Sequence, residues 1–264
     1  MPYVTSADGV RLSYEVVGSG PWLLLHLGAG CDADLWRAAG YVDKLATSYR
    51  CILFDHRGHG ASGRPRGAES HRLRLYVADV LAVLDELHVA SCAFWGYSRG
   101  IDTGLLLAAE HRERIWALVG NGTVVGGMSA ERAAELAAEF GLHRWEKLLE
   151  RFDVQEPDPV PVWMKERIRA TDVDQFVDFC KAIALDGWDA QAQLPHVQAP
   201  TLFLTGERED PQDMMARLVA RMPDGRRVRL RGLGHINAFL KSDLVLPAVR
   251  LCLEKHAPAY PASA

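Results

Sequence analysis

Ser98 is the residue of this chain whose surroundings point most directly to chemistry. It lies in the pattern Gly-Tyr-Ser-Arg-Gly at residues 96–100, where an apolar run gives way to a segment with helical spacing. A serine at the apex of a sharp strand-to-helix turn has a strained backbone, and side chains at Gly96 and Gly100 would clash there. Such a turn displays the hydroxyl beside the helix start, where the N–H of Arg99 can bind an oxyanion. The pattern predicts a nucleophile, with an ordinary tight turn as the competing interpretation.

A serine nucleophile needs a base, because its hydroxyl is hardly ionised at neutral pH. Of the ten histidines, His26 and His56 each follow a predicted strand and are expected to be structural. Seven others fit surface positions: His59, His71, His88, His111, His143, His196 and His256. His235 stands out because it follows a glycine-containing loop between the last predicted strand and the last predicted helix. His235 is therefore the candidate base.

The segments around these residues alternate between strands and helices. Apolar runs of about five residues are separated by segments with helical spacing, which is typical of a parallel sheet covered on both faces. A short hairpin is expected to come first, around the turn at residues 7–9. The predicted strands that follow are residues 22–27, 51–55, 92–96, 115–122, 201–206 and 226–232. The alternation predicts the α/β fold class.

One long block interrupts the alternation. Residues 129–190 show helical spacing only. A helical block inserted into a strand–helix alternation indicates a cap over one end of the sheet. We therefore expect a core of residues 1–126 and 191–258 and a helical cap at 127–190. The proline- and alanine-rich tail at 259–264 is expected to be disordered.

Composition argues against several classes of function. The 264 residues carry a formal net charge of −4 with scattered arginines, so no basic surface suggests a nucleic-acid partner. No apolar run has signal-peptide or membrane-spanning length, which predicts a cytoplasmic protein without a membrane partner. The five cysteines show no regular spacing, and no metal-ligand cluster is apparent. The expected partner is a small-molecule substrate, and the oligomeric state stays open.

Four motifs accompany the serine pattern along the chain. They are LLLHLGAG at residues 23–30, DHRGHGASGRP at 55–65, WDAQAQLPHVQAPTLFLTGE at 188–207 and GLGH at 232–235. Together with the serine pattern they resemble the α/β-hydrolase superfamily, over nearly the whole chain. The resemblance implies an eight-stranded, mostly parallel sheet with helices on both faces and an inserted helical cap.

The resemblance also implies which residues assist Ser98. In the family, the loop that corresponds to the one carrying His235 hangs over the nucleophile. The family's acid stands three residues after the glycine that ends the seventh strand, here Gly206. Counting without a gap gives Glu209, whereas an Asp-Pro dipeptide, common at the family's acid, argues for Asp210 with one inserted residue. Either carboxylate could accept the imidazole N–H and stabilise the imidazolium, and we slightly favour Glu209.

The loop expected to complete the oxyanion hole departs from the family pattern. Where the family usually has His-Gly, residues 26–30 are His-Leu-Gly-Ala-Gly, with Leu27 as the unusual residue. The second oxyanion N–H, beside that of Arg99, is expected from Gly28 or alternatively from Ala29. The side chain of Arg99 is expected to pair elsewhere rather than to meet a substrate carboxylate.

These residues predict a serine hydrolase without a cofactor, acting on a small carboxylic ester or lactone through an acyl-enzyme. Carbon–carbon hydrolysis, or a cyclisation or elimination in a biosynthetic pathway, remains an alternative, because the same hole stabilises an enolate. A ligand-binding module that kept the fold and lost turnover is an alternative of another class. Relatives with an aspartate nucleophile are disfavoured, because the turn carries a serine.

Overall fold

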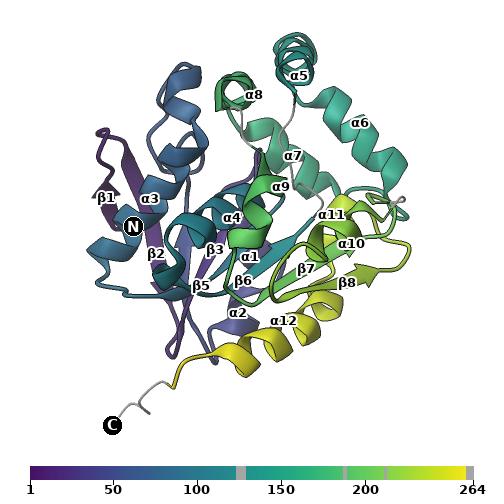
Figure 1. Cartoon of the computed structure of the whole chain (residues 1–264). Coiled ribbons are helices and arrows are strands. Elements are labelled where there is room, and N and C mark those ends of the chain that lie inside the picture. The colour runs from purple at the N-terminus through teal and green to yellow at the C-terminus, as the bar shows by residue number, and fades with distance from the viewer. Residues whose placement is uncertain (123–128, 187–188, 211–212, 260–264) are drawn as a thin grey trace.

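An eight-stranded sheet forms the centre of the molecule (Figure 1). The computed structural model describes residues 1–122, 129–186, 189–210 and 213–259. The strands are β1 (Tyr3–Thr5), β2 (Arg11–Val17), β3 (Trp22–His26), β4 (Arg50–Phe54), β5 (Cys92–Tyr97), β6 (Ile115–Asn121), β7 (Thr201–Gly206) and β8 (Gly225–Leu230). Their order is β1-β2-β4-β3-β5-β6-β7-β8, in which β2 is antiparallel to both of its neighbours, β1 and β4, and every other neighbouring pair is parallel. The predicted hairpin and mostly parallel sheet are confirmed.

Successive side chains of the central strands are buried on opposite faces of the sheet. On β3, Leu23 packs into the hydrophobic cluster on one face and Leu24 into the cluster on the other. On β5, Trp95 packs into the same cluster as Leu23, and Phe94 packs into the same cluster as Leu24. A strand buried on both faces needs apolar side chains at consecutive positions. The central strands therefore occur in the sequence as continuous apolar runs.

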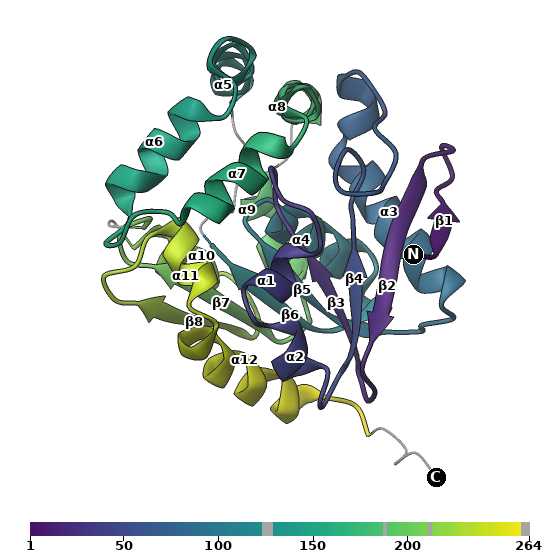
Figure 2. The same cartoon turned by 180° about the vertical axis from the view of Figure 1, so that it is seen from behind.

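Helices cover both faces. On the face of Leu23 and Trp95 lie α1 (Leu35–Ala38), α2 (Val42–Leu45) and α12 (Ser242–His256). On the opposite face lie α3 (Leu73–Glu86), α4 (Gly100–Glu110) and α10 (Met214–Val219). Figure 1 shows α3 and α4 in front of the sheet. In the opposite view of Figure 2, α1, α2 and α12 lie in front of it. Short 3-10 turns occupy Ala68–His71, Arg112–Arg114 and Leu194–His196.

Four helices gather beyond one end of the sheet in both views (Figures 1 and 2). They are α5 (Ala130–His143), α6 (Glu146–Gln155), α7 (Val162–Ala170) and α8 (Val173–Asp186), and α9 (Ala190–Gln193) follows them before β7. This all-helical insertion agrees with the expected cap. Its predicted bounds remain a prediction, and residues 127–128 and 187–188 lie outside the described ranges. The predicted disordered tail also falls outside them, except for residue 259.

No helix among the described residues is long and apolar enough to cross a membrane.

A buried arginine holds the loop after β4 in place. The Arg57 side chain is 0% exposed, and its Nε and Nη2 donate to the two carboxylate oxygens of Asp79 at 2.7 and 2.6 Å. Its remaining donors bond to Asp8 in the β1–β2 turn and to the carbonyl of Ser70. All five guanidinium N–H groups thus have a partner. The loop after β4 is therefore fastened to the N-terminal hairpin and to α3.

Replacing Asp79 with alanine is expected to lower the free energy of unfolding by about 3–5 kcal/mol, because it leaves a buried guanidinium without its main partner. Urea denaturation followed by tryptophan fluorescence measures the change. Asp85→Ala is the matched control on the same helix, since its pair with Arg114 leaves the aspartate side chain 67% exposed. That loss is expected to stay below about 1 kcal/mol. Equal losses for the two variants would contradict this role of Arg57.

Candidate active site

Ser98 occupies a strained turn between β5 and α4. Its φ is 54°, in the left-handed region that residues with a side chain rarely adopt. A Cβ at Gly96 would lie 2.6 Å from the backbone of Gly100, and a Cβ at Gly100 would lie 2.6 Å from the carbonyl oxygen of His26. The N–H of Ser98 donates to the carbonyl of Asn121 at 2.9 Å, which ties the turn to β6. Both glycines are therefore required by close backbone approach.

His235 links Ser98 to a carboxylate. Its Nε2 lies 3.1 Å from Ser98 Oγ, and its Nδ1 lies 2.6 Å from Glu209 Oε2. The other carboxylate oxygen of Glu209 accepts the N–H of Gly206 at 2.8 Å, which holds the acid against the end of β7. Because a carboxylate only accepts, Nδ1 carries the proton and Nε2 is the free base that faces the hydroxyl. The structure thus brings together three of the predicted residues in one hydrogen-bonded chain.

The alternative assignment of the acid to Asp210 is corrected. Asp210 is buried, but its carboxylate accepts the backbone N–H groups of Met214 and Met215 at 2.7 and 2.9 Å. These donors lie in the first turn of α10, where backbone N–H groups have no partner within the helix. Adjacent residues in the turn after β7 therefore have different partners, and only Glu209 bonds to His235.

Two aromatic rings stack on the imidazole of His235. The Tyr97 ring stacks on it at a centroid distance of 5.0 Å, and the Phe152 ring of α6 stacks at 5.7 Å. Burial alone would lower the pKa of His235, but the negative charge and hydrogen bond of Glu209, with the charge of Glu156, raise it above 6.5. The base is therefore stronger than a free imidazole, at a site largely shielded from water.

The residues predicted for the oxyanion hole surround Ser98. A Cβ at Gly28 would lie 2.7 Å from Ser98 Cβ and 3.0 Å from the backbone N of Arg99, so only glycine fits there. Ala29 lines the same cavity as Ser98 and Arg99. The Arg99 side chain pairs with Asp102 of α4 at 2.9 Å, as the sequence analysis expects. It also contributes to the wall of the cavity.

A buried histidine supports the loop that carries Gly28. The N–H of Gly30 donates to His59 Nε2 at 3.1 Å, and His59 Nδ1 lies 3.3 Å from the carbonyl oxygen of Arg57. Burial lowers the pKa of His59 to about 4, so its ring stays neutral and Nε2 stays an acceptor. The expectation that His59 lies on the surface is wrong, because the tight loop after β4 folds it inward. The expectation that His71 lies on the surface is also wrong, because its side chain is buried.

The cavity in front of Ser98 has a volume of about 290 Å³. Besides Ser98, His235 and Glu209, its walls include Ala29, Cys31, Arg99 and Gln155. Helices α6, α7 and α8 contribute apolar side chains: Leu148, Phe152, Met164, Ile168 and Phe176. The cap thus provides much of the surface that a bound molecule would contact. A small, largely apolar molecule fits this shape.

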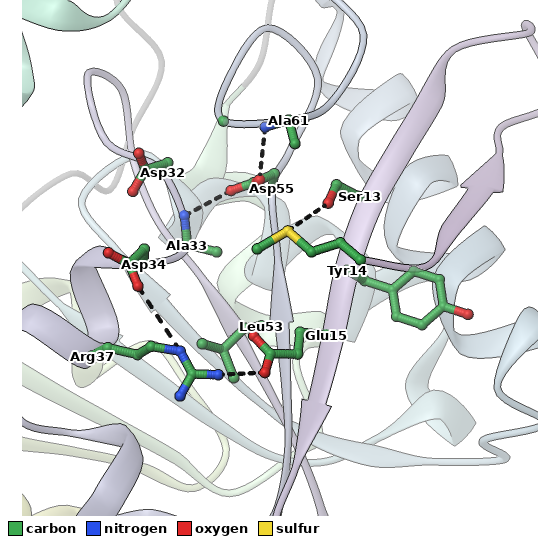
Figure 3. A pocket seen from close by; sticks show the side chains of 12 residues that line it. Ser13, Tyr14, Glu15, Asp32, Ala33, Asp34, Arg37, Leu53, Asp55 and Ala61 are labelled. Carbon is green, nitrogen blue, oxygen red and sulfur yellow. Dashed lines mark hydrogen bonds and ion pairs between the residues drawn. The ribbon is translucent and has the colours of Figure 1, made fainter.

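A second cavity, of about 220 Å³, lies beside β2 and β4 (Figure 3). Its charged groups are already engaged, since Arg37 pairs with Glu15 at 2.6 Å. The carboxylate of Asp55 accepts the N–H groups of Ala33 and Ala61 at 2.8 and 2.9 Å, which ties two loops together (Figure 3). No cluster of metal-ligating side chains occurs in the described part of the chain. The charged groups of this second cavity therefore serve to hold the surrounding loops and strands together.

Comparisons with known proteins agree with this fold. The profile of the family described as "alpha/beta hydrolase fold" matches residues 21–155. The 3-oxoadipate enol-lactonase 2 of Acinetobacter baylyi is 29% identical over 226 residues, which cover 80% of this chain and 80% of that protein. The crystal structure of the enol-lactonase from Burkholderia xenovorans LB400 matches with a TM-score of 0.79 and 27% identity, covering 96% of this chain and 100% of that one. A thermophilic esterase from Thermogutta terrifontis has a TM-score of 0.85 at 21% identity, covering 97% and 99%, which shows the fold alone.

Sequence reasoning missed two residues next to His235. Phe152 lies in a helical segment whose spacing indicates only packing, and Glu156 follows it before a proline-rich stretch. Neither position carries a local signal, because each meets His235 only after the cap has folded onto the core.

Glu209→Gln and Asp210→Asn separate the roles of the two adjacent acids. Glu209→Gln is expected to lower kcat about 10³- to 10⁴-fold, because the base loses the partner that fixes its tautomer and stabilises the imidazolium. Asp210→Asn is expected to lower the free energy of unfolding by about 1 kcal/mol, through the weaker cap of α10, with kcat nearly unchanged. Steady-state kinetics on p-nitrophenyl butyrate and urea denaturation measure both. The reverse assignment would be required if Asp210→Asn lost activity and Glu209→Gln kept it.

Proposed function

We propose that this chain, which belongs to the alpha/beta hydrolase family, is a serine hydrolase. It cleaves a small carboxylic ester or lactone through an acyl-enzyme. The observation that carries the proposal is the chain of hydrogen bonds from Glu209 through His235 to Ser98, at a strained turn facing a cavity. The enol-lactonases to which the chain is similar support a substrate of this chemical class.

The first half-reaction forms the acyl-enzyme. Ser98 Oγ attacks the carbonyl carbon while its proton passes to His235 Nε2, 3.1 Å away. Glu209 accepts the N–H of Nδ1 and stabilises the imidazolium that results. His235 then gives the proton to the leaving alkoxide, so that the alcohol departs; from a lactone, the hydroxyl remains attached to the acyl group.

The carbonyl oxygen becomes negatively charged when Ser98 attacks. The backbone N–H of Arg99, at the start of α4, and that of Gly28 are the donors we assign to this oxyanion, with Ala29 as the alternative to Gly28. The hydrogen bond between His59 and Gly30 holds this loop in position before substrate arrives. Preorganised donors of this kind stabilise the developing charge without reorganising during the reaction.

The second half-reaction releases the acid. Water attacks the acyl carbonyl while His235 Nε2 takes its proton, and the collapse of the second tetrahedral intermediate restores the hydroxyl of Ser98. Side chains, backbone amides and water supply every group in this scheme.

Size and polarity of the cavity set the substrate class. A volume of about 290 Å³ suits a molecule of modest size, and the apolar side chains of the cap favour an uncharged acyl or alkyl part. We therefore place short-chain esters and small lactones ahead of long-chain lipids.

A panel of p-nitrophenyl esters and five- and six-membered lactones tests the proposal. The wild-type protein is expected to hydrolyse members of the panel, and Ser98→Ala is expected to lose at least about a thousandfold in kcat. Circular dichroism and the melting temperature establish that the variant is folded. A folded Ser98→Ala protein that retains wild-type hydrolysis would rule the assignment out.

The pH dependence of the reaction follows from the pKa of His235. Protonated imidazole cannot take the serine proton, so kcat/KM is expected to fall as the pH drops through this pKa. Because the pKa is raised by Glu209 and Glu156, the midpoint of the acid limb is expected above pH 6.5. Hydrolysis of p-nitrophenyl butyrate across a pH series measures it. A midpoint clearly below pH 6.5 would contradict the environment described for His235.

A further inference from the structure

A carboxylate from the cap binds the backbone on both sides of His235. Glu156 directly follows α6 and is only 5% exposed. Its Oε1 accepts the N–H of Ile236 at 2.6 Å, and its Oε2 accepts the N–H groups of Gly234 and Asn237 at 3.1 and 3.2 Å. Three backbone donors in four consecutive residues therefore converge on one buried carboxylate.

The residue before His235 shows how tightly this contact is built. A Cβ at Gly234 would lie 2.7 Å from the carboxyl carbon and both carboxylate oxygens of Glu156. Any side chain at this position would push the carboxylate off the backbone. The second glycine of the GLGH motif thus leaves room for the carboxylate of Glu156. It also directly precedes α11 (His235–Leu240).

The same face of α6 also contacts the imidazole ring. Phe152 lies one turn before Glu156, and residues four apart share a helix face. Its ring stacks on that of His235 with an interplanar angle of 14°. One end of α6 thus contacts His235 through a ring and holds its backbone through a carboxylate.

We propose that Glu156 is a positioning residue that fixes the place of His235 through the backbone on both sides of it and couples the cap to the catalytic base. The inference rests on the proposed function, in which His235 is that base. The carboxylate of Glu156 holds the backbone of residues 234–237 in place, so that His235 Nε2 lies within hydrogen-bond distance of the Ser98 hydroxyl. Withdrawal of α6 would release this backbone and remove a negative charge from beside the imidazole.

Electrostatics agree with the geometry. After burial, which acts in the opposite direction, Glu209 and then Glu156 raise the pKa of His235. Burial raises the pKa of Cys31, in the same cavity, to about 12 and that of Tyr97 well above its usual value, so both stay neutral. The Arg99 guanidinium, also in the cavity wall, is paired with Asp102. Glu209 and Glu156 are therefore the carboxylates that shift this base.

Glu156→Gln tests the proposal, because glutamine keeps the size of the side chain but removes its charge and turns an N–H group toward the backbone donors. The matched control is Asp158→Asn, two residues further on, where an exposed carboxylate pairs with Lys241 at 3.0 Å. The pKa of His235 is read from its imidazole proton signals by NMR, assigned by their absence in His235→Gln. Hydrolysis of p-nitrophenyl butyrate gives kcat and KM, and thermal denaturation gives the melting temperature.

Glu156→Gln is expected to lower the pKa of His235, to move the acid limb of kcat/KM to lower pH, and to reduce plateau kcat about tenfold with little change in KM. Asp158→Asn is expected to leave the pKa and kcat near their wild-type values. Should Glu156→Gln fail to fold, Glu156→Asp retains the charge but withdraws the carboxylate by one methylene, and reduced kcat is again expected.

A folded Glu156 variant with wild-type pKa and kcat, whatever its melting temperature, would show that the contact only joins cap and core, and would overturn the proposal. The NMR titration needs no turnover. If the wild-type protein hydrolyses nothing, the proposed function fails, while a lowered His235 pKa in Glu156→Gln would still show that Glu156 controls the imidazole.

Discussion

The backbone of Ser98 sits in a conformation that costs on the order of 1–3 kcal/mol, and much of the surrounding structure serves to hold it there. β5 lies inside the sheet, flanked by β3 and β6, so the strand that enters the turn cannot shift. α4, which leaves the turn, is buried along most of its length. Glycines at positions 28, 96 and 100 allow three stretches of backbone to approach within distances that no side chain permits. The strain places the hydroxyl beside His235 Nε2 and beside the backbone N–H groups that we propose as oxyanion donors.

The groups around Ser98 are held by contacts that come from distant parts of the chain. The buried pair of Arg57 and Asp79 fastens the loop after β4, and that loop supplies His59, which in turn binds the oxyanion loop at Gly30. On the other side, Glu209 bonds to the end of β7 and the cap contacts His235 through α6. A cap that shields this region from water also strengthens every charge interaction within it. Cap and core therefore both contact His235, the proposed base.

Much of the fold and part of the site could be predicted from the sequence. Strands buried on both faces produce continuous apolar runs, and the turn at Ser98 requires glycines, so both leave local signals. The choice between Glu209 and Asp210 could not be made locally, because two adjacent acids differ only in the direction their side chains take. His59 was expected at the surface because loops usually lie there. Glu156 accepts hydrogen bonds from backbone groups 78 to 81 residues away in the chain, and no sequence spacing indicates that contact.

The proposed function requires that the turn display an activated serine. Incubation with a fluorophosphonate, followed by digestion and mass spectrometry of the adduct, tests it without knowledge of the substrate. We expect a single covalent adduct on Ser98, formed faster at a pH above the pKa of His235 than below it. A folded protein that takes up no label, or that carries the label on another residue, would contradict it.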